Sequence, residues 1–107
     1  MATIVLVCAA GVSGTFLAKR LAPSLPDVEF VVATEDALED ALGRADAVLV
    51  APQLAASLDL IRRRAAPRPV EVLPAAAMTP AGSILAVDAV DGLVQTLTAS
   101  PQRSTDV

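Results

Sequence analysis

Residues 3–17 read Thr3-Ile4-Val5-Leu6-Val7-Cys8-Ala9-Ala10-Gly11-Val12-Ser13-Gly14-Thr15-Phe16-Leu17. The stretch opens with a continuous run of mostly β-branched residues, which is typical of a strand buried on both faces. From Cys8 onward small residues, two glycines and two hydroxyl side chains follow, and the apolar pattern returns at Phe16 and Leu17. This order predicts a strand, a tight loop and a helix. The loop would lie at the carboxyl edge of a parallel sheet, where α/β folds bind ligands.

The rest of the chain repeats this alternation of strands and helices. Strands are predicted over residues 3–8, 28–34, 46–51 and 70–73. Helices are predicted to follow them over residues 13–22, 35–42, 54–64 and 84–97. Thr34 is expected to cap the second helix and Gly43 to end it. The pattern indicates an α/β fold with a four-stranded, parallel, flavodoxin-like sheet of order 2-1-3-4 and helices on both faces. Cys8 would then lie at the carboxyl end of a central strand.

Composition narrows the class of protein. The chain has 107 residues, of which 54% are hydrophobic, and its net charge is −4, which argues against nucleic-acid binding. No apolar run reaches the ~20 residues of a membrane span, and no signal-peptide pattern follows Met1. With no histidine and one cysteine, the chain offers no zinc site and no histidine-activated nucleophile. We expect one domain over residues 1–100, a flexible tail over 101–107, no cofactor and no metal.

The loop after Cys8 favours an anion. Small residues let backbone N–H groups converge at a helix N-terminus, and Ser13 and Thr15 add hydroxyl donors. The same positive field favours the thiolate of Cys8, which is the nucleophilic form. Cys8 is therefore the candidate nucleophile, and it would carry a phosphoryl group as phosphocysteine. The candidate phosphate-binding residues are Ala9, Ala10, Gly11, Val12, Ser13, Gly14 and Thr15.

The groups that are missing narrow the range of reactions. A cysteine phosphatase of the C-x5-R kind needs an arginine where this chain has Gly14, so hydrolysis should be slow and the phosphoryl group stored. A thiol relay of the arsenate-reductase kind needs further cysteines. An aspartyl phosphate needs acidic residues at the strand ends that Cys8 and Ala51 occupy. The loop also lacks the Walker A and G-x-G-x-x-G nucleotide patterns.

Two segments resemble a known family. Residues 8–15 resemble the phosphorylation loop, close to C-S-A-G-M-S-T-S, of the lactose/cellobiose-type enzyme IIB components of the sugar phosphotransferase system. Residues 48–55 resemble the family's second signature, V-L-L-G-P-Q-I-A. The fourth predicted strand and the length also agree, so the resemblance covers roughly residues 3–98. Ala9, Gly14 and Ala56 depart from the usual serine, threonine and tyrosine.

The resemblance implies a phosphotransferase component. Cys8 would accept a phosphoryl group from a phosphohistidine on a IIA partner and pass it to a sugar held by a membrane-embedded IIC partner. The protein would be cytoplasmic, held at the inner face of the membrane through IIC without inserting itself. Pro52 and Gln53 lie at the predicted sheet edge of Cys8 and are candidate contacts to the loop or to a partner.

Two other readings stay open at this point. One is a small cysteine phosphatase or thiol reductase, and the other is a non-catalytic regulatory module on the same fold. A lone cysteine in an apolar strand is also often a small buried hydrophobe. The run Arg62-Arg63-Arg64 is expected to complement the negative end of the third helix.

Overall fold

The structure is a computed structural model that describes the backbone of residues 2–9, 12–79 and 81–106. The strands are β1 (Ala2–Val7), β2 (Val28–Ala33), β3 (Ala47–Val50) and β4 (Val70–Val72). The α-helices are α1 (Val12–Leu21), α2 (Leu38–Leu42), α3 (Leu58–Ala65) and α4 (Ser83–Asp106). Short 3₁₀ turns are η1 (Ala22–Ser24), η2 (Glu35–Ala37), η3 (Pro52–Ser57) and η4 (Ala75–Met78). Each predicted strand and helix is present.

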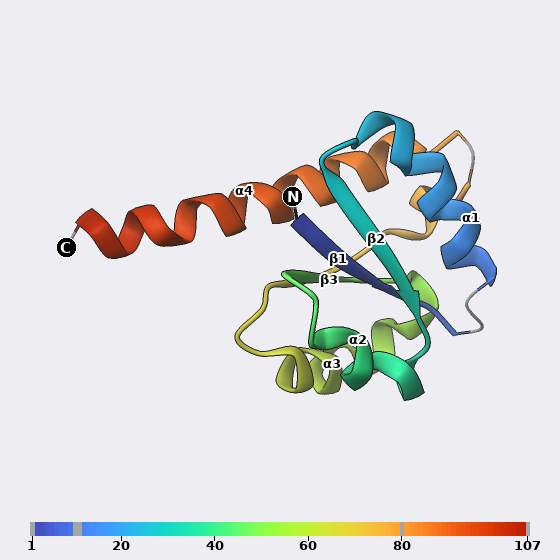
Figure 1. Ribbon diagram of the computed structural model, residues 1–107. Helices are drawn as coiled ribbons and strands as arrows, with labels where there is room; N and C mark the ends of the chain where they lie inside the picture. Colours follow the sequence, from blue (N-terminus) through green and yellow to red (C-terminus); the bar gives the residue numbers. More distant parts are fainter. Residues whose placement is uncertain (1, 10–11, 80, 107) are drawn as a thin grey trace.

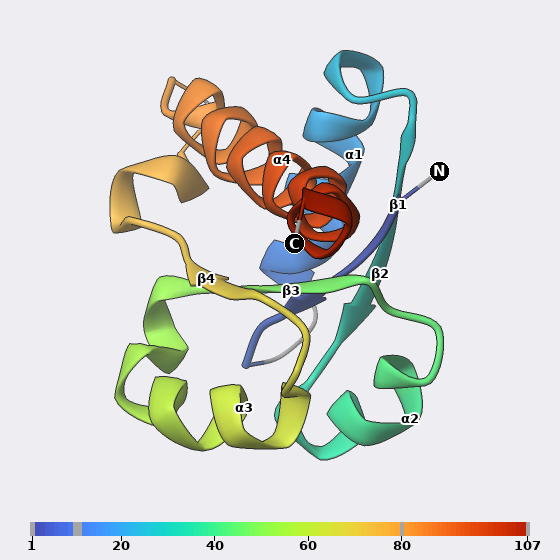
Figure 2. The same ribbon diagram turned by 90° about the vertical axis from the view of Figure 1, so that its left-hand side faces the viewer.

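The four strands form one parallel sheet in the order β2-β1-β3-β4, which confirms the predicted topology. The register places Val7 opposite both Ala33 of β2 and Val50 of β3, and Val50 opposite Val72 of β4. The carboxyl ends of all four strands therefore meet at one edge. Helices α1 and α4 cover one face of the sheet, and α2 and α3 cover the other (Figures 1 and 2).

Strand β1 is buried on both sides, as its apolar run predicts. Ile4 and Leu6 belong to the core under α1 and α4, whereas Val5 and Val7 belong to the core over α2 and α3. All four side chains are fully buried. Because successive strand residues face opposite sides of a sheet, only a continuous apolar run satisfies both cores. Burying each of these side chains contributes about 1.5–3 kcal/mol.

The predicted second helix is divided into two parts. It begins as η2 and becomes a five-residue α2. The predicted cap is wrong, because Thr34 makes no side-chain hydrogen bond to the helix end. Gly43 does follow the last helical residue, but at φ −58° it needs no glycine-specific conformation. The predicted third helix is likewise divided, because the segment after Pro52 is the 3₁₀ turn η3 and α3 begins at Leu58.

Helix α4 spans 24 residues and is the longest element. Its first half packs on the sheet through Ala86, Val90 and Leu93, and its last turns extend away from the sheet (Figure 1). The helix continues past residue 100, where we placed the end of the domain, and the flexible tail stays a prediction. Within the described part of the chain, no helix has both the length and the hydrophobicity that crossing a lipid bilayer requires.

Candidate functional site

Cys8 lies at the carboxyl edge, immediately after the last residue of β1. Its backbone N–H donates to the carbonyl oxygen of Ala33 at 3.0 Å, so the pairing with β2 continues one residue beyond the strand. On the other side, Ala51 donates its N–H to the carbonyl oxygen of Val7 at 2.9 Å. The cysteine is therefore held between the two neighbouring strands, at the position that the sequence predicts.

The side chain of Cys8 is directed toward α1. It continues the series of Ile4 and Leu6, which face the α1 side of the sheet. The residue has 0% of its surface exposed. A Cβ atom built on Gly14 would lie 2.7 Å from the Cys8 sulfur and 3.0 Å from Cγ1 of Val32. The sulfur therefore lies against the first turns of α1, at a point where the helix has no side chain.

This contact changes the interpretation of Gly14. The sequence shows it as the place of a missing arginine and of a lost hydroxyl. The structure adds a steric reason, since any side chain at this position would overlap the sulfur of Cys8. The sequence did not identify Val32, which lies near the same point, or Ala33, whose carbonyl oxygen accepts the Cys8 N–H. The signal was available, because Val32 follows Phe30 on the α1 side of its strand.

The candidate phosphate-binding residues are only partly covered by the structure. Ala9 is exposed directly after Cys8, and Ala10 and Gly11 lie outside the described residues. Helix α1 begins at Val12, so the backbones of Val12, Ser13 and Gly14 form its first turn, and Thr15 follows with an exposed side chain. First-turn N–H groups have no partner within their own helix and carry the positive end of its dipole. Phosphate binding by these residues stays a prediction.

The second signature lies at the same edge. Ala51 is fully buried, Pro52 is half-buried and Gln53 is exposed in η3. Leu54 turns back over this segment by donating its N–H to the carbonyl of Ala51 at 3.0 Å. Because β1 and β3 are neighbours in register, the segments after them share one edge, as the sequence predicts. A contact of Gln53 with the loop or with a partner stays a prediction.

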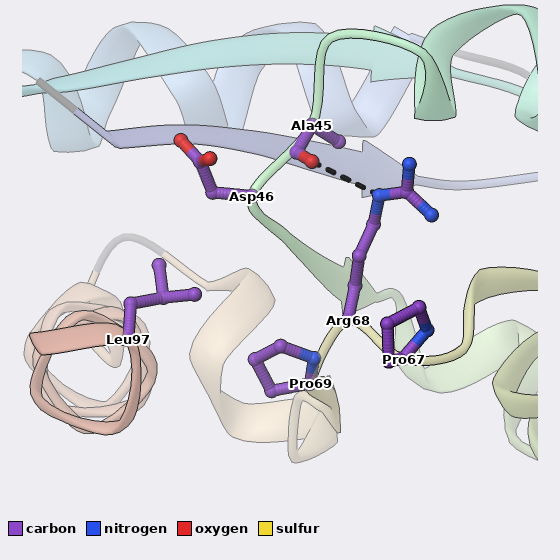
Figure 3. Close-up of a pocket in the computed structure, with 6 residues that line it drawn as sticks. All are labelled: Ala45, Asp46, Pro67, Arg68, Pro69 and Leu97. Atoms are coloured by element: carbon purple, nitrogen blue, oxygen red, sulfur yellow. Dashed lines mark hydrogen bonds between the residues drawn. The ribbon is translucent and has the colours of Figure 1, made fainter. Parts of the chain in front are cut away.

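A pocket of about 360 Å³ lies at the opposite, amino edge of the sheet (Figure 3). It is lined by Ala45, Asp46, Pro67, Arg68, Pro69 and Leu97. Arg68 donates from Nε to the carbonyl of Ala45 at 3.0 Å and from Nη1 to the carbonyl of Ala65 at 3.2 Å. Asp46 accepts the backbone N–H of Thr3 at 2.8 Å. Asp46 and Arg68 therefore connect backbone segments that lie apart in the sequence or end a helix. The pocket is separate from the Cys8 site.

The arginines of α3 have structural partners. Arg62, Arg63 and Arg64 lie in the last turn of α3, as predicted for charges that complement a helix end. Arg64 also pairs with Glu39 of α2, with Nε 3.3 Å from Oε2. Arg68, which the sequence did not single out, binds the last carbonyl of α3. Within residues 2–9, 12–79 and 81–106, no cluster of acidic residues and cysteine is arranged to hold a metal ion.

Comparison with protein families gives one match that spans most of the chain. Residues 3–86 match the family described as "PTS system, Lactose/Cellobiose specific IIB subunit". The matched span contains β1 from Thr3 onward, the strands β2, β3 and β4, Cys8 with its loop, and the segment after β3. No individual curated protein matches the chain significantly.

Proposed function

Because this chain belongs to the lactose/cellobiose-specific IIB family of the sugar phosphotransferase system, we propose that Cys8 is the residue that carries the phosphoryl group. The chain is a phosphoryl-transfer subunit, and the family works with IIA and IIC components. In our proposal a phosphohistidine of IIA is the donor, and a sugar bound by IIC is the acceptor. The protein would act in the cytoplasm, at the membrane face where IIC is reached.

Transfer on Cys8 takes two steps. In the first, the Cys8 thiolate attacks phosphorus, an S–P bond forms, and the P–N bond breaks with its electron pair left on the imidazole of IIA. In the second, a sugar hydroxyl oxygen attacks phosphorus and the S–P bond breaks with its pair left on sulfur, which restores the thiolate. The chain contains no histidine, so the donor imidazole must come from IIA. The hydroxyl proton would pass to a group on the sugar-binding partner.

The observation that carries this proposal is the position of the chain's only cysteine. Cys8 follows the central strand β1, and three residues separate it from α1, so the sulfur and the helix N-terminus lie at one edge of the sheet. A phosphoryl group there would be stabilised by first-turn N–H groups and the helix dipole, with no acidic side chain in that turn to repel it. Gly14 stands where a phosphatase needs arginine, which favours storage over hydrolysis.

The proposed partner contacts lie around the same edge. Gln53 is exposed in η3, and Phe16 is 61% exposed in α1, two residues after Gly14. An aromatic side chain this exposed is a typical anchor for a protein partner. We propose that Phe16, Pro52 and Gln53 contact IIA or IIC when the phosphoryl group is transferred.

The test is mass spectrometry of the protein after incubation with phosphoenolpyruvate, the general phosphotransferase components and a IIA protein. The wild type is expected to gain the mass of one phosphoryl group, and Cys8→Ala is expected to gain none. Gly92→Ala is the matched control, because Gly92 is exposed on α4 and an added Cβ there meets nothing within 4 Å. An undiminished adduct on Cys8→Ala, or none on the wild type, would rule the proposal out. Turnover of p-nitrophenyl phosphate by the protein alone would indicate a phosphatase instead.

A further inference from the structure

We infer that Gly14 is a positioning residue for Cys8. Its missing side chain lets the sulfur rest in a closed position under α1, from which the sulfur must turn outward to receive a phosphoryl group. This inference rests on the proposed role of Cys8 as the phosphoryl carrier. It concerns the state of the thiol between transfers rather than the transfer itself.

The closed position is defined by three groups that meet at one point. Gly14 is buried, and a Cβ on it would lie 2.7 Å from the Cys8 sulfur and 3.0 Å from Cγ1 of Val32. In protein structures, Cβ atoms essentially never come within 3.0 Å of such a neighbour. Since Cys8 exposes none of its surface, the sulfur is covered in this position. The space that the sulfur occupies exists because residue 14 is glycine.

A phosphoryl group does not fit this position. It would add three charged oxygens to a fully buried sulfur that lies against Gly14 of α1, with a Val32 methyl group near the same point. Burying charge against apolar atoms without partners is strongly unfavourable. A histidine of another protein also cannot reach an atom with no exposed surface. Phosphorylation would therefore require the sulfur to leave this position, and rotation about the Cα–Cβ bond of Cys8 is the movement that its side chain allows.

The closed position therefore predicts a protected thiol and a slower reaction. When only a fraction of molecules has the sulfur turned outward, the observed rate of every bimolecular reaction of that sulfur is the intrinsic rate multiplied by this fraction. A methyl group at position 14 would occupy the closed position and leave the outward one. Gly14→Ala should then raise the reactivity of Cys8 toward any reagent. A purely structural role for Gly14 would change stability without this gain.

The first measurement is the rate at which iodoacetamide alkylates Cys8 in the folded protein. We expect Gly14→Ala to react at least about tenfold faster than the wild type, because the outward fraction rises toward one. Gly92→Ala should react at the wild-type rate. In the double variant Gly14→Ala/Val32→Ala, the smaller side chain at position 32 leaves room for the sulfur beside the new methyl group. The alkylation rate should therefore fall back toward the wild-type value. An unchanged rate in Gly14→Ala would overturn the inference.

Two further measurements distinguish faster alkylation caused by the outward sulfur from unfolding and from the proposed function. The free energy of unfolding in urea is measured for each variant, and an alkylation rate that simply follows the unfolded population overturns the inference. The rate of phosphorylation by phosphorylated IIA at limiting concentration should rise in Gly14→Ala along with alkylation. Faster alkylation without faster phosphorylation would overturn the inference that the closed position of the sulfur limits its phosphorylation. If wild-type Cys8 is never phosphorylated, the proposed function fails, whereas the alkylation result still reports the position of the sulfur.

Discussion

At the carboxyl edge of the sheet, backbone groups and small side chains meet, whereas at the amino edge charged side chains bind the backbone. Cys8, Ala51 and Leu73 each donate an N–H to the carbonyl of a residue on the neighbouring strand, at 2.8–3.0 Å. At the other edge, Asp46 accepts the N–H of Thr3 and Arg68 donates to the carbonyls of two chain segments.

The difference shows where this fold leaves room for chemistry. At the amino edge, the charges of Asp46 and Arg68 are already engaged by the protein's own backbone, so the pocket beside them is a structural feature. At the carboxyl edge, the segments that lead into α1 and η3 follow neighbouring strands, and no side chain stands between Gly14 of α1 and the Cys8 sulfur. Small residues there serve close packing, and added volume should be costly. The charged residues of the amino edge should matter for stability and not for transfer.

The largest effect is expected for Gly82→Ala, in the turn between η4 and α4 on the carboxyl side of the sheet. A Cβ at this position would overlap the carbonyl group of Ala76 and lie 3.0 Å from Oγ1 of Thr79. Because the obstacle is backbone, the turn must shift, and we expect a loss of about 2–3 kcal/mol in the free energy of unfolding. Urea denaturation measures it, with Gly92→Ala as a control that should gain up to about 1 kcal/mol. Equal stability of the two variants would contradict close packing at this edge.

A smaller effect is expected for Arg68→Ala at the amino edge. The substitution removes two hydrogen bonds to the carbonyls of Ala45 and Ala65 from a half-buried guanidinium. We expect unfolding to become easier by about 1–2 kcal/mol, while Cys8 is phosphorylated at the wild-type rate. Exposed Arg63→Ala is the matched control and should change stability by less than about 0.5 kcal/mol. Slower phosphorylation of folded Arg68→Ala would show that the two edges are coupled.

The smallest effect is expected for Glu39→Gln, away from both edges. Its ion pair with Arg64 joins α2 to α3, but the Glu39 side chain is 70% exposed. Exposed pairs of this kind contribute about 0.2–1 kcal/mol and are screened by salt. The difference in unfolding free energy from the wild type should therefore be small at low salt and vanish at high salt. A loss that persists at high salt would show that Glu39 stabilises the helices by more than its charge.

Much of the fold follows from the sequence because its two signals, the apolar pattern and the residues that begin or end a segment, are local. The apolar run of residues 4–7 is typical of a strand covered on two sides, and Pro52 and Gly43 mark where neighbouring segments begin and end. The Thr34 cap was wrong: its backbone is extended, as at a helix cap, but the segment begins as the short 3₁₀ turn η2 and the side chain makes no hydrogen bond to it. Arg68 was missed because its partners, Ala45 and Ala65, are brought together by the packing of separate segments.

The candidate site was predicted in part. Cys8 and the segment after β3 lie at one edge, because parallel strands with adjacent register must end together. The direction of the sulfur was not predicted. It could have been, because alternate residues of a strand face the same side, so Cys8 faces the side of Ile4 and Leu6. The meaning of Gly14 depends on how closely α1 approaches β1 and β2, which no local pattern records.

The sequence by itself determined the class of fold and the order of the elements, and it singled out the residue that we propose to carry the phosphoryl group. These depend on periodicity and on residue chemistry, which neighbours along the chain set. Only the tertiary structure decided that Cys8 is fully buried, and that its sulfur lies against Gly14 with Val32 near the same point. The three residues come from the segment after β1, from α1 and from β2, and their distances depend on the packing of those elements against one another.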